Sequence, residues 1–381
     1  MTSAVAWLAL LALFALVTWL GKHLRLMPIV SQLLLATLGL PLLMLWTTPL
    51  GLGASELLAP VWLEPLYGLA FCLLLGHILS DVVDLQLEPG SLQIALPSFF
   101  VPFFCGLACA LWLLPQQSGL ATIAVGLLFA LTAIPVLFLY LQHQGYPVAK
   151  IRQLLQAAII MDVLCWLIFG LAQGSSDPPT LLWPLLAASL PLLLRLLPLR
   201  SARLNGACFL ALLLLMQQLH LNALVFGIAY LLLLTALRLP LRLPLPAGVM
   251  HWLQTWLAVP LILAFGLLQI NWQDAWHGYS AWQFGALLLL PIISKLAGNW
   301  LGLSWAAGQL RAYAGQWRES LLLNTRGLTE IIFLNLLLQQ QIISPPLYFA
   351  LMLMGLISTL LPALAGSPTA HSEARSRYEV S

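Results

Sequence analysis

Apolar residues fill the chain in long runs, and short polar segments separate one run from the next. Most runs approach the ~20 residues that a helix needs to cross the hydrocarbon core of a membrane. The pattern predicts an all-α polytopic membrane protein with about 13 transmembrane helices. The predicted helices span 4–21, 28–46, 60–79, 93–114, 119–141, 153–172, 180–197, 205–219, 221–237, 250–269, 282–306, 319–339 and 346–365.

The composition excludes several classes of protein. Hydrophobic residues make up 61% of the chain and charged residues only 7%, whereas a soluble domain is about 25% charged. The sequence contains no Walker loop, no hydrolase triad and no basic stripe for nucleic acid. These features argue against an ATP-driven pump, an enzyme and a nucleic-acid-binding protein, and they call for no cofactor.

The positions of Lys and Arg predict the orientation, because cytoplasmic loops of membrane proteins are rich in both. With the N-terminus outside and the C-terminus in the cytoplasm, every basic residue in a loop, in the tail or near a helix end falls on the cytoplasmic side. These residues are Lys22, Arg25, Lys150, Arg152, Arg195, Arg200, Arg203, Arg238, Arg242, Arg311, Arg318, Arg375 and Arg377. The predicted location is a cell membrane, with the bacterial inner membrane favoured.

The helix count predicts an internal repeat. The first six and the last six helices are related by a shift of seven, and an odd shift inverts the second half in the membrane. Inverted repeats with interrupted helices that cross near the midplane are typical of secondary transporters, including those with the sodium/proton antiporter fold. Helix 119–141 then corresponds to 319–339, and helix 93–114 corresponds to 282–306.

Asp162 lies at the centre of the predicted helix 153–172. An acid in the middle of a membrane helix costs ~2.5–3.5 kcal/mol on insertion scales, so such residues usually have a function. We interpret Asp162 as a binding site for a cation or proton. The alternative is a structural ion pair with another helix.

Thr132 and Pro135 predict an interruption in helix 119–141. Proline has no N–H and clashes with the carbonyl four residues earlier, so the helix should kink or unwind around Thr132. Freed carbonyls and the Thr132 hydroxyl would supply oxygen ligands for an alkali cation. The alternative is an ordinary proline kink, which neighbouring helices satisfy.

Lys295 is the natural counter-charge for Asp162. It lies within the helix 282–306, and that segment stays apolar as far as Ala307. A buried ammonium can also act as a proton carrier. The alternative is that Lys295 extends its ammonium to the membrane surface.

Helix 319–339 carries Asn324, Arg326, Gly327 and Glu330. Arg326 and Glu330 are four residues apart, so they lie on one helix face and can pair with each other. That local pair is one interpretation. The other is a structural clamp on an interrupted helix, in which Gly327 allows close approach of the backbone.

Asp81 and Asp84 follow the helix 60–79 in a predicted cytoplasmic loop. We expect them to be solvated, and the alternative is that they line an entrance for cations.

Five motifs together resemble the second family of the cation:proton antiporter superfamily, which includes glutathione-gated potassium efflux proteins and plant cation/proton exchangers. They are Met27-Pro28-Ile29-Val30-Ser31-Gln32-Leu33, Leu131-Thr132-Ala133-Ile134-Pro135-Val136, Ala158-Ile159-Ile160-Met161-Asp162-Val163, Ser294-Lys295-Leu296-Ala297-Gly298 and Asn324-Thr325-Arg326-Gly327-Leu328-Thr329-Glu330. The sequence departs from the family at Met161, where Asp, Asn or Gln is common.

The resemblance implies a homodimeric exchanger of Na⁺ or K⁺ for H⁺. Its membrane domain would cover residues 1–366, and residues 367–381 would form a short cytoplasmic tail. Helices within 93–172 and 282–365 would form a moving core, and helices within 4–79 and 205–269 would form the dimer and gate scaffold. Asp162 would be the shared cation and proton site, Thr132 a neighbouring ligand and Lys295 the charge partner.

Three functional hypotheses follow. The first is exchange of a monovalent cation for protons by alternating access. The second, motivated by Met161, is a transport-inactive relative that acts as a sensor or assembly partner. The third is sodium-coupled uptake of an organic anion on the same fold, which Lys295 would favour.

Overall fold

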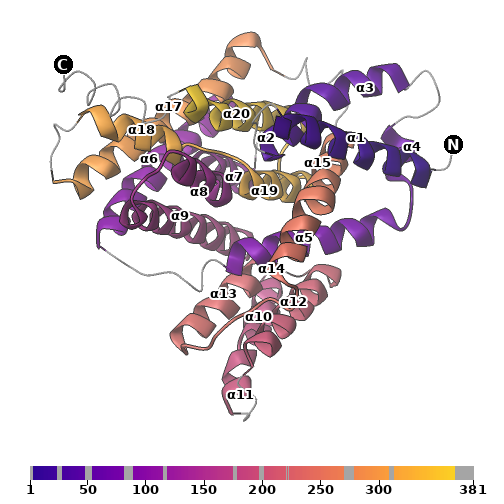
Figure 1. Ribbon diagram of the computed structural model, residues 1–381, viewed down its shortest axis with the longest axis horizontal. Coiled ribbons are helices and arrows are strands. Elements are labelled where there is room, and N and C mark those ends of the chain that lie inside the picture. Colours follow the sequence, from indigo (N-terminus) through magenta and orange to yellow (C-terminus); the bar gives the residue numbers. More distant parts are fainter. Residues whose placement is uncertain are drawn as a thin grey trace. The chain divides into compact units, whose positions relative to one another are not determined.

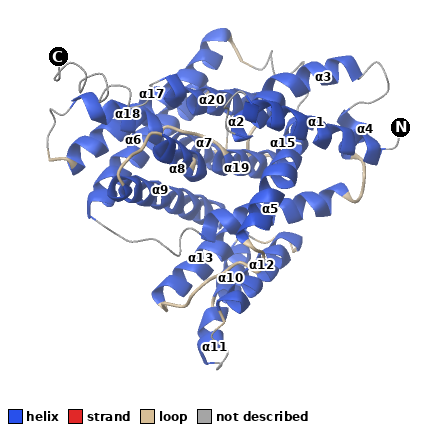
Figure 2. Ribbon diagram, in the orientation of Figure 1, coloured by secondary structure: helices blue, strands red, loops and turns tan. Residues whose placement is uncertain are grey.

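The computed structural model of the protein is helical throughout the part of the chain that it describes, with no strand there (Figure 2). The structure describes residues 3–23, 28–47, 54–80, 89–114, 118–174, 178–196, 201–219, 221, 223–269, 279–308 and 313–364. Asp81, Asp84 and the predicted tail 367–381 lie outside the described residues.

Every predicted membrane span contains helix in the structure, and the bounds agree to within a few residues (Figure 1). The helices are α1 (Ser3–His23), α2 (Pro28–Leu34), α3 (Leu40–Thr47), α4 (Ala54–Leu58), α5 (Leu63–Ser80), α6 (Pro89–Leu113), α7 (Gly119–Ala130), α8 (Ile134–His143), α9 (Val148–Gly174), α10 (Pro178–Ala188), α11 (Leu190–Leu196), α12 (Ala202–Gln218), α13 (Ala223–Ala236), α14 (Ala247–Leu253), α15 (Val259–Leu268), α17 (Ala281–Ala306), α18 (Tyr313–Leu323), α19 (Leu328–Gln339) and α20 (Pro345–Leu364). Two π-helical segments, η1 (Leu35–Gly39) and η4 (Gln254–Ala258), continue α2 into α3 and α14 into α15.

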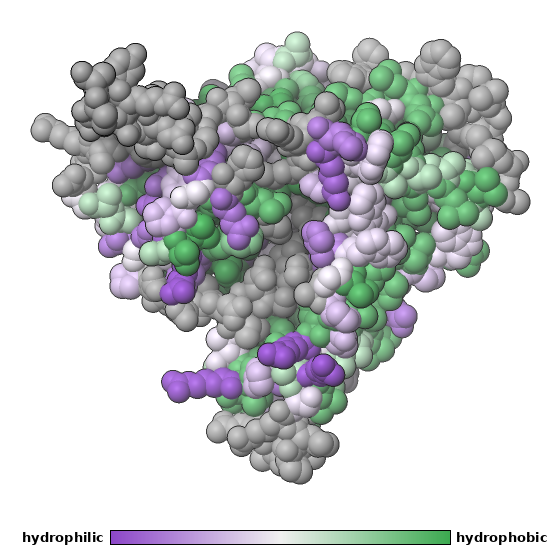
Figure 3. All heavy atoms as spheres, viewed as in Figure 1, coloured by the Kyte–Doolittle hydropathy of each residue, from purple (hydrophilic) through white to green (hydrophobic). Residues whose placement is uncertain are grey.

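Six of the described helices are long and apolar enough to cross a membrane, and six further helices are apolar but shorter. Large apolar side chains are exposed along α1, such as Leu8, Leu16 and Trp19. Apolar side chains also reach the surface on the face that Figure 3 shows. This exposure suits a surface in contact with lipid, and the protein is a multi-pass membrane protein. The count of 13 crossings stays a prediction.

The chain forms two compact units. Unit 1 comprises residues 1–85, 166–278 and 331–349, and unit 2 comprises residues 86–165, 279–330 and 350–381. Unit 1 contains both π-helical segments, and there the Gln32 side chain donates a hydrogen bond to the Thr255 carbonyl oxygen at 2.7 Å. The division into core and scaffold implied by the resemblance stays a prediction. All of the buried charged side chains described below lie in unit 2.

Glycines let the helices of unit 2 approach one another closely. A Cβ atom added to Gly298 of α17 would lie 2.6 Å from the Pro97 carbonyl oxygen of α6. A Cβ atom added to Gly106 of α6 would lie 2.7 Å from the Gly126 Cα atom of α7. Small residues at such spacings are typical of tight helix pairs in membranes. They set α6 against α17 and α7, which brings the backbone of α6 within reach of Lys295.

Candidate functional site

Two helices of unit 2 are interrupted, and their breaks contact each other. The first break covers residues 131–133, between α7 and α8, and the second covers residues 324–327, between α18 and α19. The Ala133 N–H donates a hydrogen bond to the Thr325 carbonyl oxygen at 2.8 Å, which joins the two breaks directly. Pro135 lies in the first turn of α8, where its missing N–H costs the helix nothing.

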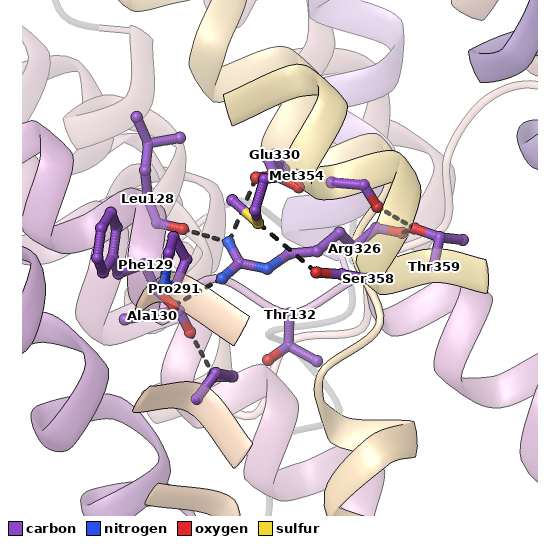
Figure 4. A network of polar contacts seen from close by, with 12 residues as sticks. Leu128, Phe129, Ala130, Thr132, Pro291, Arg326, Glu330, Met354, Ser358 and Thr359 are labelled. Atoms are coloured by element: carbon purple, nitrogen blue, oxygen red, sulfur yellow. Dashed lines mark hydrogen bonds and ion pairs between the residues drawn. The ribbon is translucent and has the colours of Figure 1, made fainter. Parts of the chain in front are cut away.

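The C-terminal end of α7 leaves four carbonyl groups without helical partners, as every helix end does. The Leu127 carbonyl accepts a hydrogen bond from the Leu131 N–H at 3.1 Å. The next two carbonyls, of Leu128 and Phe129, accept hydrogen bonds from the Arg326 guanidinium (Figure 4). The Ala130 carbonyl accepts one from the Lys295 ammonium. Two buried cations therefore cap the negative end of the α7 dipole.

The Lys295 side chain is fully buried, and three groups accept from its ammonium. They are the Ala130 carbonyl, the Ser98 carbonyl at 3.1 Å and the Met161 sulfur at 3.3 Å. The Ser98 carbonyl needs a partner because Pro102, four residues later, has no N–H to donate. Lys295 therefore binds two carbonyls that the helices themselves leave open.

Arg326 and Glu330 form a buried ion pair. Their side chains lie 3.3 Å apart and are 0% and 4% exposed. Glu330 is packed tightly, because a Cβ atom added to Gly355 of α20 would lie 2.7 Å from its Oε2 atom. The Thr359 hydroxyl of α20 donates to the Arg326 carbonyl oxygen at 2.6 Å, so α20 also holds the backbone of the second break.

At the C-terminal end of α18, the open carbonyl groups accept hydrogen bonds from neutral groups instead. The Thr132 hydroxyl, from the first break, donates to the Leu323 carbonyl oxygen at 3.2 Å. The Asn299 side chain of α17 donates to the Ser320 carbonyl oxygen at 2.9 Å. The Thr325 N–H donates to the Leu322 carbonyl at 3.1 Å. Each break thus supplies a group that caps the helix that leads into the other.

Asp162 lies on α9 with its side chain buried, at 4% exposure. It attracts the Lys295 ammonium electrostatically. Its chain neighbour Met161 contacts that ammonium through its sulfur. The sulfur is a weak acceptor, and it occupies the position at which the resembled family commonly has a polar side chain.

Four charged side chains are buried in the part of the chain that the structure describes: Asp162, Lys295, Arg326 and Glu330. Two are acidic and two are basic, so the group is neutral when all four are ionised. This arrangement can take up a cation only if another positive charge leaves or moves, because an uncompensated charge in a membrane interior is costly.

The structure brings together Thr132, Lys295, Arg326 and Glu330 through contacts between the two breaks and α17. Sequence reasoning missed Ser98, Asn299, Ser320 and Thr359. The sequence held a signal for Ser98. Pro102, four residues later, has no N–H, so the Ser98 carbonyl has no helical partner and needs another donor. The carbonyls of Leu128, Phe129 and Ala130 accept hydrogen bonds from Arg326 and Lys295, and binding of an alkali cation by freed carbonyls stays a prediction.

The amino-acid sequence matches no protein-family model and no curated protein. The fold, by contrast, matches solved structures. One is the sodium proton antiporter MjNhaP1 from Methanocaldococcus jannaschii at pH 8, with a TM-score of 0.57 and 14% sequence identity over 96% of this chain and 97% of that chain. The protein therefore has a sodium/proton antiporter fold, which confirms the predicted fold class. The finer assignment to the second family stays a prediction.

Proposed function

We propose that this protein exchanges a monovalent cation, Na⁺ or K⁺, for protons across the membrane by alternating access. Asp162 is the shared site for the cation and the proton, Thr132 is a neighbouring ligand and Lys295 is the charge partner. The fold likeness to a sodium proton antiporter supports this proposal. The observation that carries it is the buried Asp162 carboxylate, which lies in the electrostatic field of a buried ammonium.

The charge balance suggests how exchange works. A cation that reaches Asp162 adds one positive charge to a neutral group of four buried side chains. Release of one proton from the Lys295 ammonium restores neutrality, and return of a proton to the site drives the cation off again. The Thr132 hydroxyl donates its hydrogen to Leu323, so its oxygen lone pairs stay available to a cation.

Arg326 and Glu330 have a supporting role in this scheme. Their ion pair and the hydrogen bonds from Arg326 to α7 hold the two breaks together. We propose that the two breaks therefore move as one body during transport.

We also propose that the protein acts as a homodimer, as the resemblance to cation:proton antiporters implies.

The test is flux in proteoliposomes that contain the purified protein. Addition of Na⁺, K⁺ or Li⁺ to vesicles with an imposed pH gradient should dissipate that gradient for at least one cation. The Asp162→Asn protein, reconstituted at the same density, is the control for leak.

Two other results would point to the competing hypotheses. If the folded protein dissipates the pH gradient with none of the three cations, exchange is rejected. That result would favour a sensor or assembly partner, which Met161 already suggests. Sodium-dependent uptake of an organic anion without proton movement would favour the third hypothesis.

A further inference from the structure

A buried polar seam runs between α17 and α18, two helices that pack side by side in unit 2 (Figure 1). We call it the α17–α18 seam, and it consists of Asn299, Ser304, Gln316, Ser320 and Asn324. These side chains are 0%, 2%, 7%, 3% and 0% exposed, respectively. Three of them recur every four residues along α18 and its C-terminal end, so they form one stripe on that helix.

Hydrogen bonds tie the seam together at two levels. The Ser304 hydroxyl donates to Gln316 Oε1 at 3.0 Å. One turn further along α18, Asn299 Nδ2 donates to the Ser320 carbonyl at 2.9 Å, and the Ser320 hydroxyl donates to the Leu296 carbonyl at 2.8 Å.

Each level also carries polar atoms without a partner among the residues that the structure describes. They are Gln316 Nε2 at the first level, Asn299 Oδ1 at the second, and both Oδ1 and Nδ2 of Asn324 at the third. Successive levels are about 6 Å apart along the helix. Because buried polar atoms are nearly always hydrogen-bonded, and buried water typically makes about three hydrogen bonds, water is the ligand that suits this series of donors and acceptors.

The seam extends from the second break towards the beginning of α18. At its inner end, Asn324 is the first residue of the second break, and Asn299 lies one turn from Lys295 on α17. At its outer end, Gln316 lies in the first half of α18 and is followed by Trp317, which is 45% exposed. Arg318, two residues after Gln316, belongs to the predicted cytoplasmic side, so the outer end of the seam points towards that surface.

We propose that the α17–α18 seam binds a file of water molecules that carries protons between the cytoplasm and the site. The proposal rests on the exchange of a cation for protons proposed above. Each water accepts one proton from its neighbour and passes one of its own to the next, so no water is consumed. The Lys295 and Arg326 cations at the inner end repel metal cations, and the cation therefore reaches Asp162 by another route.

Gln316→Met and Asn299→Leu test the file, because both changes keep the approximate shape and remove the amide. Gln156→Met is the matched control, since Gln156 is also buried and its Oε1 also accepts from a serine, Ser91, at 3.3 Å, away from the seam. We expect the two seam variants to lose about 100-fold in maximal exchange rate, the lower end of what a positioned proton-transfer group contributes. Equilibrium binding of radioactive Na⁺ should stay as in the wild type, and the control should exchange normally. Seam variants that exchange at the wild-type rate would overturn the proposal.

A second measurement detects bound water directly and does not depend on transport. X-ray radiolytic labelling in H₂¹⁸O marks side chains that touch bound water. We expect ¹⁸O on Lys295 and Leu296 in the wild type, and strongly reduced labelling there in Asn299→Leu but not in Gln156→Met. Absence of label in the wild type would refute the file even if exchange occurs. Label in a wild-type protein that exchanges no cation would refute the proposed exchange and leave the water file standing.

Discussion

The C-terminal ends of α7 and α18 face the same physical problem and solve it differently. Both are helix ends in the interior of a membrane protein, so each presents open carbonyls that water cannot reach. At α7, two cations, Arg326 and Lys295, cap the carbonyls. At α18, neutral groups do so, chiefly the Thr132 hydroxyl and the Asn299 amide.

The difference indicates which of the two helix ends lies beside an acid that can bind a cation or a proton. Neutral donors satisfy carbonyls without any further requirement. Cations satisfy them as well, but each needs a counter-charge nearby, and Glu330 and Asp162 supply the negative charge. The charged end therefore brings an acid that a cation or proton can occupy, whereas the neutral end acts as scaffold. Four changes would break or sharpen this contrast.

The largest expected effect is complete loss of exchange in Asp162→Asn. The amide keeps the shape of the side chain and removes the charge that a cation or proton needs. The measurement is cation-driven proton flux in proteoliposomes, with size-exclusion chromatography to verify folding and assembly. Glu330→Gln, a change at the other buried acid, is the matched control and should keep measurable exchange. Flux at the wild-type rate in Asp162→Asn would remove Asp162 from the mechanism.

Arg326→Ala should be the most destabilising of the four changes. It leaves Glu330 as an unpaired buried charge and removes two caps from α7. Loss of one partner of a buried ion pair typically costs about 3–5 kcal/mol. Thermal unfolding in detergent should shift to clearly lower temperature, and the yield of folded protein should fall. The double variant with Glu330→Gln should recover part of the loss, and an unchanged unfolding temperature in Arg326→Ala would show that the pair does not hold the breaks together.

Thr132→Val tests the neutral end and should have a smaller effect. The variant loses one hydrogen bond to the Leu323 carbonyl, which is typically worth about 0.5–1.5 kcal/mol. If Thr132 also binds the cation, the half-saturating cation concentration should rise while the maximal rate changes little. Thr359→Val removes a threonine hydroxyl that caps the Arg326 carbonyl, so it should lower stability without raising half-saturation. If the half-saturating cation concentration is the same in both variants, Thr132 only caps the Leu323 carbonyl and does not bind the cation.

The smallest expected effect is that of membrane potential, which should leave the flux unchanged. With a single carboxylate at the site, one cation replaces one proton and no net charge crosses. A transport step that moved net charge would gain ~2.3 kcal/mol per elementary charge per 100 mV. A potassium-diffusion potential imposed during Na⁺-driven proton flux measures this directly. Strong acceleration or inhibition would contradict the one-carboxylate scheme, and Met161→Asp, which adds a second carboxylate beside Lys295, should introduce such sensitivity.

Local rules were sufficient to predict the first break and the charged candidates, whereas an interruption of 319–339 was only one of two interpretations. Pro135 cannot donate a backbone hydrogen bond to the turn before it, and it predicted the interruption near Thr132 that the structure has at residues 131–133. The spacing of Arg326 and Glu330 predicted their pairing, because residues four apart share a helix face. The roles of Asp162 and Lys295 in transport stay predictions, since geometry alone does not test them.

The partners of these residues were not predictable in the same way. Lys295 binds the Ser98 and Ala130 carbonyls, which lie 197 and 165 residues away along the chain. Periodicity identifies the residues that are buried, but not which distant helix end a buried cation will meet. Asn299 and Ser320, which line the seam with Asn324, escaped notice for the same reason, because each amide or hydroxyl alone resembles ordinary helix packing.

The sequence by itself determined the all-helical membrane class, the approximate helix bounds and the interruption near Thr132, because hydrophobic run length and proline chemistry act locally. Only the tertiary structure decided that the two breaks meet, that Arg326 and Lys295 cap α7 and that Thr132 caps α18. An open carbonyl in a membrane interior must find a donor, but any donor within reach will satisfy it. The choice among donors is made when the helices pack, and the close approaches at Gly298 and Gly106 are what bring these particular donors within reach.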